Sequence, residues 1–326
     1  MVMKLKMMLI STALLLFCSS TAGAWSLWGD ADDFHDKLLQ LGAGPSGGSF
    51  GPIGDTLCDE VNKDRKTHLV RCIPIASAGS VFNIYSVANG SLQLGFGQED
   101  LIAEVFADTD AKGANTLRTV ALMHNSPIGI MVRKASGITT LAEIHKGVVN
   151  RGNRGSGIYA NANAVLKALN LADSDIAGVT FLPPVEFERA FCEGKVDVIF
   201  NALAHPSDLY KRLSACGGVF LDIPPDLMKK MMAQNQWIRP MEIAAGIYGP
   251  TQREVKTLGM RNLLISNAGV DEEAIFRLTR VINSRHKEMQ RKQPYMASVR
   301  LMVIKDVKSL AAPIHPGALR ALRMNP

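Results

Sequence analysis

The chain has 326 residues with a formal net charge of +6 at pH 7, and hydrophobic residues make up 47% of it. Its basic residues are scattered with few aromatic residues between them, a pattern that argues against nucleic acid as a partner. A mildly positive chain suits small anions better, and this length is sufficient for two units of about 150 residues each.

Residues 1–24 have the layout of a cleavable secretory signal. Two lysines precede an apolar run at residues 7–17, and small residues follow as far as Ala24. The apolar run is shorter than the roughly 20 residues that span a bilayer, and no second run approaches that length. We therefore expect residues 1–24 to be a signal peptide, the mature chain to begin at Trp25, and the protein to reach the periplasm.

The cysteines indicate an oxidising compartment. Lipidation of Cys18 is disfavoured because the bulky Phe17 precedes it. The other four cysteines allow three pairings, and we favour the two local ones because each closes a short excursion of the chain. These favoured disulfides are Cys58 with Cys72 and Cys192 with Cys216. Free thiols are less expected outside the cytosol, and a metal site is disfavoured because C-x-x-C spacing and a nearby histidine pair are missing.

From about residue 69, short β-branched runs alternate with helical patterns, which predicts an α/β fold with a largely parallel sheet. A second series of the same kind begins near Pro127. The last portion contains a long helical pattern at residues 271–290 and is too short for a third domain. We therefore expect it to complete the first unit. The predicted division is lobe 1 over 25–127, lobe 2 over 128–245, and the completion of lobe 1 with C-terminal helices over 246–326.

Two crossing strands are expected to join the lobes. The chain would cross near Ile128–Arg133 and again near Met241–Gly249. Ligands of such α/β sheets bind beyond the carboxyl ends of the strands, close to helix N-termini. The predicted fold class is therefore α/β, with two lobes, two crossing strands and a ligand cleft between the lobes.

The glycine-rich stretch at residues 42–54 fits two enzyme motifs without the structural setting of either. It contains G-x-G-x-x-G starting at Gly42 and G-x-S-x-G centred on Ser46. A dinucleotide loop needs a preceding apolar strand, for which the sequence gives a weak signal at best, and a later acidic residue for the ribose, which is missing. A nucleophile elbow needs an earlier strand for its oxyanion loop, and too few residues precede Ser46. We expect neither enzymatic activity nor a cofactor.

Three loops rich in glycine and serine lead into predicted helices, at residues 42–54, 77–83 and 151–161. Unpaired backbone N–H groups and the helix dipole favour an anion at such positions. Each loop taken alone could be a simple helix cap. Because they occur in both predicted lobes, we expect them to form an anion site in the cleft.

Short segments between Gly44 and Arg320 carry a family resemblance. They read GGSFGPIG, SAGSVFN, LGFGQED, VRKASGITTLAEI, RGSG, FCEGKVDVIFNALAHPS and APIHPGALR. This order resembles the TAXI family of TRAP-transporter solute-binding proteins. The resemblance implies a type II periplasmic binding protein that captures a small organic anion, such as a dicarboxylate, a 2-oxoacid or an acidic amino acid. It also implies delivery to the membrane permease of a TRAP transporter and no enzymatic activity. A periplasmic ligand-binding partner of a membrane sensor kinase is the alternative.

The resemblance, carried over position by position, assigns ligand-binding residues to both lobes. They are Ser46, Gly48, Ser49, Phe50, Gly79, Ser80, Val81, Gln98, Gly155, Ser156, Gly157, Asn201 and His205. Arg154 departs from the family pattern, which often has proline there, and is a further candidate because of its own chemistry. Arg154 could grip a carboxylate through its guanidinium, or it could be a solvated loop cation. His205 could instead shape the turn at the following proline.

Two acidic residues follow Gln98 directly. Glu99 and Asp100 would repel a bound carboxylate unless they face away from the ligand or bond an amino group on it. We expect them to stabilise the N-terminus of the next helix.

Overall fold

The computed structural model describes residues 36–297 and 300–324. The predicted signal peptide and the start of the mature chain lie outside these described residues. No helix in the described part of the chain has the length and apolar character needed to cross a membrane.

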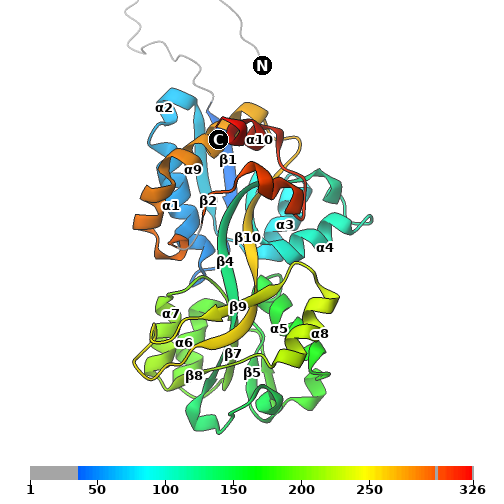
Figure 1. The fold of residues 1–326 in the computed structure, drawn as a ribbon, viewed down its shortest axis with the longest axis vertical. Helices are drawn as coiled ribbons and strands as arrows, with labels where there is room; N and C mark the ends of the chain where they lie inside the picture. Colours follow the sequence, from blue (N-terminus) through cyan, green and yellow to red (C-terminus); the bar gives the residue numbers. More distant parts are fainter. Residues whose placement is uncertain (1–35, 298–299, 325–326) are drawn as a thin grey trace, which may run out of the picture. The chain divides into compact units, whose positions relative to one another are not determined.

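The described residues have a mixed α/β architecture with helices packed against a sheet (Figure 1). The sheet follows the order β2-β1-β3-β10-β4-β7-β5-β6, with β8 paired to β4 and β9 paired to β10. Its strands are β1 (Lys37–Gly42), β2 (Val70–Ile75), β3 (Leu94–Gln98), β4 (Leu117–Arg133), β5 (Val148–Asn150), β6 (Gly178–Thr180), β7 (Val198–Ala202), β8 (Gly218–Leu221), β9 (Arg239–Ile243) and β10 (Val255–Asn267). The helices are α1 (Phe50–Asn62), α2 (Arg65–His68), α3 (Ser80–Ala88), α4 (Glu99–Ala107), α5 (Gly157–Ala168), α6 (Pro184–Cys192), α7 (Asp208–Ala215), α8 (Pro225–Gln234), α9 (Glu272–Lys292) and α10 (Pro316–Arg323).

The elements pack around separate hydrophobic cores. Helices α1 and α9 contribute to one cluster with β1–β3, and α3 and α4 contribute to a second cluster. We call these elements the first module. A third cluster gathers apolar side chains from β5, β7, β8 and α5–α8, and we call these elements, together with the paired strand β6, the second module. Val255 and Leu258, at the start of β10, belong to this third cluster. The segment after residue 245 therefore supplies core residues to the second module before it returns to the first.

Two long antiparallel strands, β4 and β10, run side by side through both parts of the sheet (Figure 1). The first portion of β4 pairs with β10 within the first module, and its residues Ile128–Val132 pair with β7 in the second. The first crossing expected from the sequence falls on this end of β4. The second crossing differs from the expectation. The expected segment, Met241–Gly249, contains the end of β9, and β9 pairs with β10. The strand that runs from one module to the other is β10. Polar residues such as Arg261 interrupt the apolar pattern of β10 and obscure its length.

Local sequence explains how α3 comes to lie directly on β3. All residues of β3 are buried, as in a central strand covered on both faces. A Cβ atom on Gly95 would lie 3.1 Å from the Cβ of Asn83, and one on Gly97 would lie 3.0 Å from Ile84. The glycines therefore let α3 approach the strand, which places the helix N-terminus beside the strand end.

Both favoured disulfides are confirmed. Cys58 in α1 is bonded to Cys72 in β2, with Cα atoms 4.8 Å apart. Cys192 at the end of α6 is bonded to Cys216, which follows α7, with Cα atoms 5.4 Å apart. Each bond therefore ties a helix to a later segment of its own module.

Candidate ligand-binding site

A pocket of about 410 Å³, counted with its open mouth, is lined by residues of both modules. The first module contributes Pro45, Gly48, Ser49, Phe50, Gly79, Ser80 and Gln98, and the second contributes Ser156, Gly157, Ile158, Pro184, Asn201, Ala202 and Leu203. None of these lining residues has a charged side chain. Its polar groups are serine hydroxyls, side-chain amides and backbone groups, and they lie among apolar side chains such as Phe50, Ile158 and Leu203.

Several helices begin at this pocket. Ser49, Gly79, Gln98 and Ser156 are the residues immediately before α1, α3, α4 and α5, and Pro184 is the first residue of α6. The first N–H groups of a helix have no carbonyl partner within that helix, and the helix dipole makes this end positive. The beginnings of these helices thus give the pocket a positive electrostatic character without a cationic side chain.

The helices that begin at the pocket differ in whether acidic residues in the first turn offset the positive end of the helix dipole. Helices α1, α3 and α5 have no acidic residue in the first turn. In contrast, α4 begins with Glu99 and Asp100, and α6 has Glu186 in its first turn. The first three helices therefore supply the uncompensated positive ends.

Four backbone donors at these ends are unpaired. Among the residues that the structure describes, no acceptor is found for the N–H groups of Ser80, Val81, Gly157 and Ile158. By contrast, the N–H of Tyr159, one residue further into α5, donates to Ser156 Oγ at 3.1 Å. An anion in the pocket would meet donors from both modules.

A buried network holds the loops of the first module in place. Ser77 Oγ accepts from the N–H of Gly44 at 2.9 Å and donates to Asn83 Oδ1 at 2.6 Å. Asn83 Nδ2 in turn donates to the carbonyl oxygens of Gly42 and Phe96, at 3.0 and 2.9 Å. The loop before α1 and the loop before α3 are thereby fixed to one another.

The two modules touch at the rim of the pocket. The N–H of Phe82 donates to the carbonyl of Gly155 at 3.2 Å, and Asn153 Nδ2 donates to the carbonyl of Ala78 at 2.9 Å. Gly79 has φ +117°, which favours glycine, and a Cβ there would lie 3.2 Å from Ser156 Cα. Glycine at this position lets the beginnings of α3 and α5 approach closely.

Two side-chain amides in the pocket lack hydrogen bonds. Gln98 at the end of β3 is 3% exposed, and Asn201 in β7 is 2% exposed. Gln98 Oε1 and Asn201 Nδ2 are buried atoms without a partner among the described residues. Buried polar atoms are nearly always paired, so both point to a missing partner in the pocket.

His124 lies behind the pocket and was not among the predicted site residues. Its Nε2 is 3.3 Å from Ser49 Oγ, and its ring packs edge-on against Phe50. Burial lowers the pKa of His124 to about 3, so the imidazole is neutral at physiological pH. It therefore adds no charge to the pocket.

Comparison with known proteins identifies the family. The sequence pattern of the NMT1-like family matches residues 41–323. The chain belongs to the NMT1-like family.

Solved structures similar to this NMT1-like chain include a periplasmic binding protein and a component of a transporter. MatC from Rhodopseudomonas palustris, solved with bound malate, is 13% identical with a TM-score of 0.55, and the match covers 79% of this chain and 88% of MatC. The periplasmic binding protein BugD is 12% identical with a TM-score of 0.53, covering 87% and 92% of the two chains. The binding component of an ABC phosphonate transporter from Pseudomonas aeruginosa is 11% identical with a TM-score of 0.51, covering 80% of each chain. The predicted α/β periplasmic-binding-protein fold is confirmed.

The structure of this NMT1-like chain brings most of the predicted site residues to one pocket. Those that line it are Gly48, Ser49, Phe50, Gly79, Ser80, Gln98, Ser156, Gly157 and Asn201. Those that do not line it are Ser46, Val81, Arg154, Gly155 and His205. The sequence reasoning missed Pro45, Ile158, Pro184, Ala202 and Leu203, of which Pro184 carried a signal because proline is common in the first turn of a helix.

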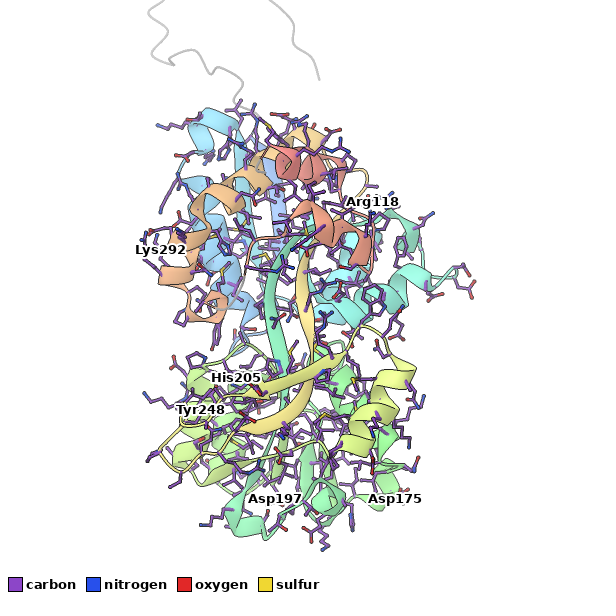
Figure 2. All side chains as sticks on the ribbon, viewed as in Figure 1. Arg118, Asp175, Asp197, His205, Tyr248 and Lys292 are labelled. Atoms are coloured by element: carbon purple, nitrogen blue, oxygen red, sulfur yellow. A yellow bond between two sulfur atoms is a disulfide. The ribbon has the colours of Figure 1, made fainter. Side chains whose placement is uncertain are left out.

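The side chains of Arg154 and His205 make their contacts outside the pocket. The guanidinium of Arg154 lies 4.5 Å from the ring centroid of Phe181. His205 and Tyr248 lie together (Figure 2), with His205 Nδ1 2.5 Å from the Tyr248 hydroxyl oxygen. Burial lowers the pKa of His205 to about 4, so this imidazole too is neutral near pH 7. Arg154 thus belongs to an aromatic surface, and His205 to an aromatic cluster within the second module.

Glu99 and Asp100 do not line the pocket. Glu99 is fully buried and forms a bidentate ion pair with Arg261 of β10, with Arg239 of β9 nearby at 3.5 Å. Burial raises the pKa of Asp100 to about 6. The positive end of α4 is therefore offset by its own acidic residues.

Proposed function

We propose that this chain is a solute-binding protein that captures a small organic anion in the pocket and delivers it to a membrane transporter. One observation carries the proposal. The uncompensated N-termini of α1, α3 and α5 meet at a pocket without charged side chains and with unpaired N–H donors. This arrangement favours a negative ligand over a neutral or positive one.

The energetics of burial support a carboxylate or a similar anion. Removing an ionised carboxylate from water is costly unless several donors replace the lost hydration. Hydrogen bonds to charged groups are worth about 1.5–3 kcal/mol each, and a favourable helix terminus adds up to about 2 kcal/mol. The N–H groups of Ser80, Gly157 and Ile158 together provide such a donor set.

Family and fold support the role in transport. MatC was solved with malate, and the Pseudomonas aeruginosa protein is a component of a phosphonate transporter. Malate and phosphonates are both anionic. We further propose a periplasmic location and a TAXI-type TRAP permease as the partner. The disulfides suit an oxidising compartment, and the sequence segments that resemble the TAXI family support the choice of permease.

We propose no enzymatic activity for this pocket. Ser49 and His124 resemble a nucleophile and its base, but catalysis of that kind needs an orienting acceptor on the second ring nitrogen. His124 Nδ1 has no such acceptor among the described residues. Its lowered pKa also makes it a poor base.

Thermal melting with a panel of organic acids tests the proposal. We expect at least one carboxylic acid to raise the melting temperature, because a ligand that binds only the folded state stabilises it. Ser156→Ala removes the hydroxyl that fixes the start of α5, so it should weaken the best ligand about tenfold. Arg154→Ala is the matched control in the same loop and should change the affinity less than twofold. Absence of stabilisation by every anion in the panel would refute the proposed function.

A further inference from the structure

We propose that Gln98 and Asn201 make the pocket selective for hydroxy acids, that is, for carboxylates that also carry a hydroxyl group. This inference rests on the proposed function and narrows its ligand class. Its basis is the pair of unpartnered amides, one from each module, that face one pocket.

The structure holds both amides at the pocket. A Cβ on Gly157 would lie 2.5 Å from Gln98 Oε1, so the Gln98 amide is in close contact with the start of α5. The backbone of Asn201 pairs with Gly129 in the β4–β7 ladder, and its carbonyl accepts from the Tyr210 hydroxyl at 2.7 Å. With 3% and 2% exposure, neither side chain exchanges its missing hydrogen bonds for bulk water.

A ligand whose only polar group is a carboxylate can accept a hydrogen bond from Asn201 Nδ2, but it cannot donate one to Gln98 Oε1. A side-chain amide offers two N–H donors and one acceptor oxygen, whereas an ionised carboxylate only accepts hydrogen bonds. In the orientation that the structure gives, the oxygen of the Gln98 amide is buried and needs a donor. A ligand hydroxyl or a ligand ammonium group supplies one.

The charges around the pocket favour the hydroxyl over the ammonium. No acidic side chain lines the pocket, and Glu99, which follows Gln98, is paired with Arg261. The positive ends of α1, α3 and α5 disfavour a second positive charge beside them. A buried ammonium would therefore lack a counter-charge, whereas a neutral hydroxyl donates to the Gln98 oxygen and accepts from the Asn201 amide.

Calorimetric titration with acids that differ by one hydroxyl tests this inference. The pairs are malate and succinate, lactate and propionate, and 2-hydroxyglutarate and glutarate, with aspartate as the ammonium probe. For at least one pair, the wild-type protein should bind the hydroxy acid ten or more times more tightly than its partner acid. Malate should also bind more tightly than aspartate.

Two variants test whether Gln98 and Asn201 cause the preference for hydroxy acids. Gln98→Met keeps the length of the side chain but removes its hydrogen-bonding groups, so the hydroxy-acid preference should fall below threefold. Asn201→Leu provides an independent second variant with the same expected loss. Gln234→Leu removes an exposed glutamine amide at the end of α8, outside the pocket, and should keep the full preference.

The outcomes separate the two proposals. If no acid binds, the proposed function and this inference both fail. If acids bind but the wild-type protein does not prefer the hydroxylated member of any pair, only the selectivity inference fails. It also fails if Gln98→Met and Asn201→Leu both keep the tenfold preference.

Discussion

Gly157, the first residue of α5, lies close to the side chain of Gln98. A Cβ at this position would lie 2.5 Å from Gln98 Oε1 and 2.6 Å from its Cδ. We expect Gly157→Ala to displace the flexible end of Gln98 from the pocket and to weaken the best ligand about tenfold. Because helix start positions accept alanine, the melting temperature should change little. Titration calorimetry and thermal melting measure both quantities.

The Gly157 prediction has a matched control. Gly51 is also near the start of a helix, and a Cβ there meets nothing within 4 Å. Gly51→Ala should therefore bind the ligand like the wild type. If Gly157→Ala acts through Gln98, combining it with Gln98→Met should cause no further loss, because the two changes share one contact. Wild-type affinity in Gly157→Ala would contradict this account.

At this scale, the sequence predicted the backbone contributions better than the long side chains. Ser156 and Gly79 could be placed in the site because capping preferences act within a few residues. The positions of Arg154 and His205 depend on Phe181 and Tyr248, which come from other segments, so the local sequence held no cue to them. The contact of His124 with Ser49 is also long-range, and the wide spacing of the histidines suggested no role for it.

Helix α1 is tied to α9 by a buried carboxylate. Glu60 is fully buried and accepts hydrogen bonds from Lys63 and Lys292 at 2.6 Å and from Arg285 at 3.2 Å. Burial alone would raise the pKa of Glu60, but these bonds outweigh burial and lower the pKa from 4.5 to about 2. The ionised carboxylate thus stabilises the packing of α1 on α9, behind the pocket-forming end of α1.

Replacing Glu60 should change both stability and its pH dependence. We expect Glu60→Gln to reduce the free energy of unfolding by about 2 kcal/mol at pH 7, because the variant loses a buried, ion-paired carboxylate. The loss is moderate because the cationic partners of Glu60 are partly solvated. The lowered pKa means that this stabilisation is present above pH 4.5 and is lost as the pH falls from 4.5 toward 2. Urea unfolding of variant and wild type at several pH values measures the difference.

The control for Glu60 is a partly exposed acid on α9, the helix against which α1 packs. Glu288 of α9 pairs with Arg291 and Lys292 at the surface, and Glu288→Gln should cost less than about 1 kcal/mol. A Glu60→Gln difference that stays constant from pH 7 to pH 2 would contradict the assigned ion pairs.

Elements with strong local patterns could be predicted from the sequence. Buried Ile53, Leu57 and Val61 share one face of α1, and such spacing indicates a helix without tertiary information. Strand β10 was harder because Gly259 and Arg261 break its apolar pattern. Its length is set by pairing with β4, which lies far away in the sequence, as well as with the preceding strand β9.

At the scale of the whole described chain, the alternation of strands and helices predicted the periplasmic-binding-protein fold. The arrangement of the pocket required the structure, because it depends on contacts such as Phe82 with Gly155 between segments about 70 residues apart along the chain. The two modules share β4 and β10, so a ligand that bridges their helix N-termini would hold them together. The central claim is that backbone donors of these helices, and no cationic side chain, bind the anion.

A crystal structure of the protein with the acid that stabilises it most tests this claim most directly. The account predicts carboxylate oxygens about 3 Å from the backbone nitrogens of Ser80, Gly157 or Ile158, with no lysine or arginine side chain on the carboxylate. A carboxylate bound by the Arg154 guanidinium, or a ligand held outside this pocket, would contradict it.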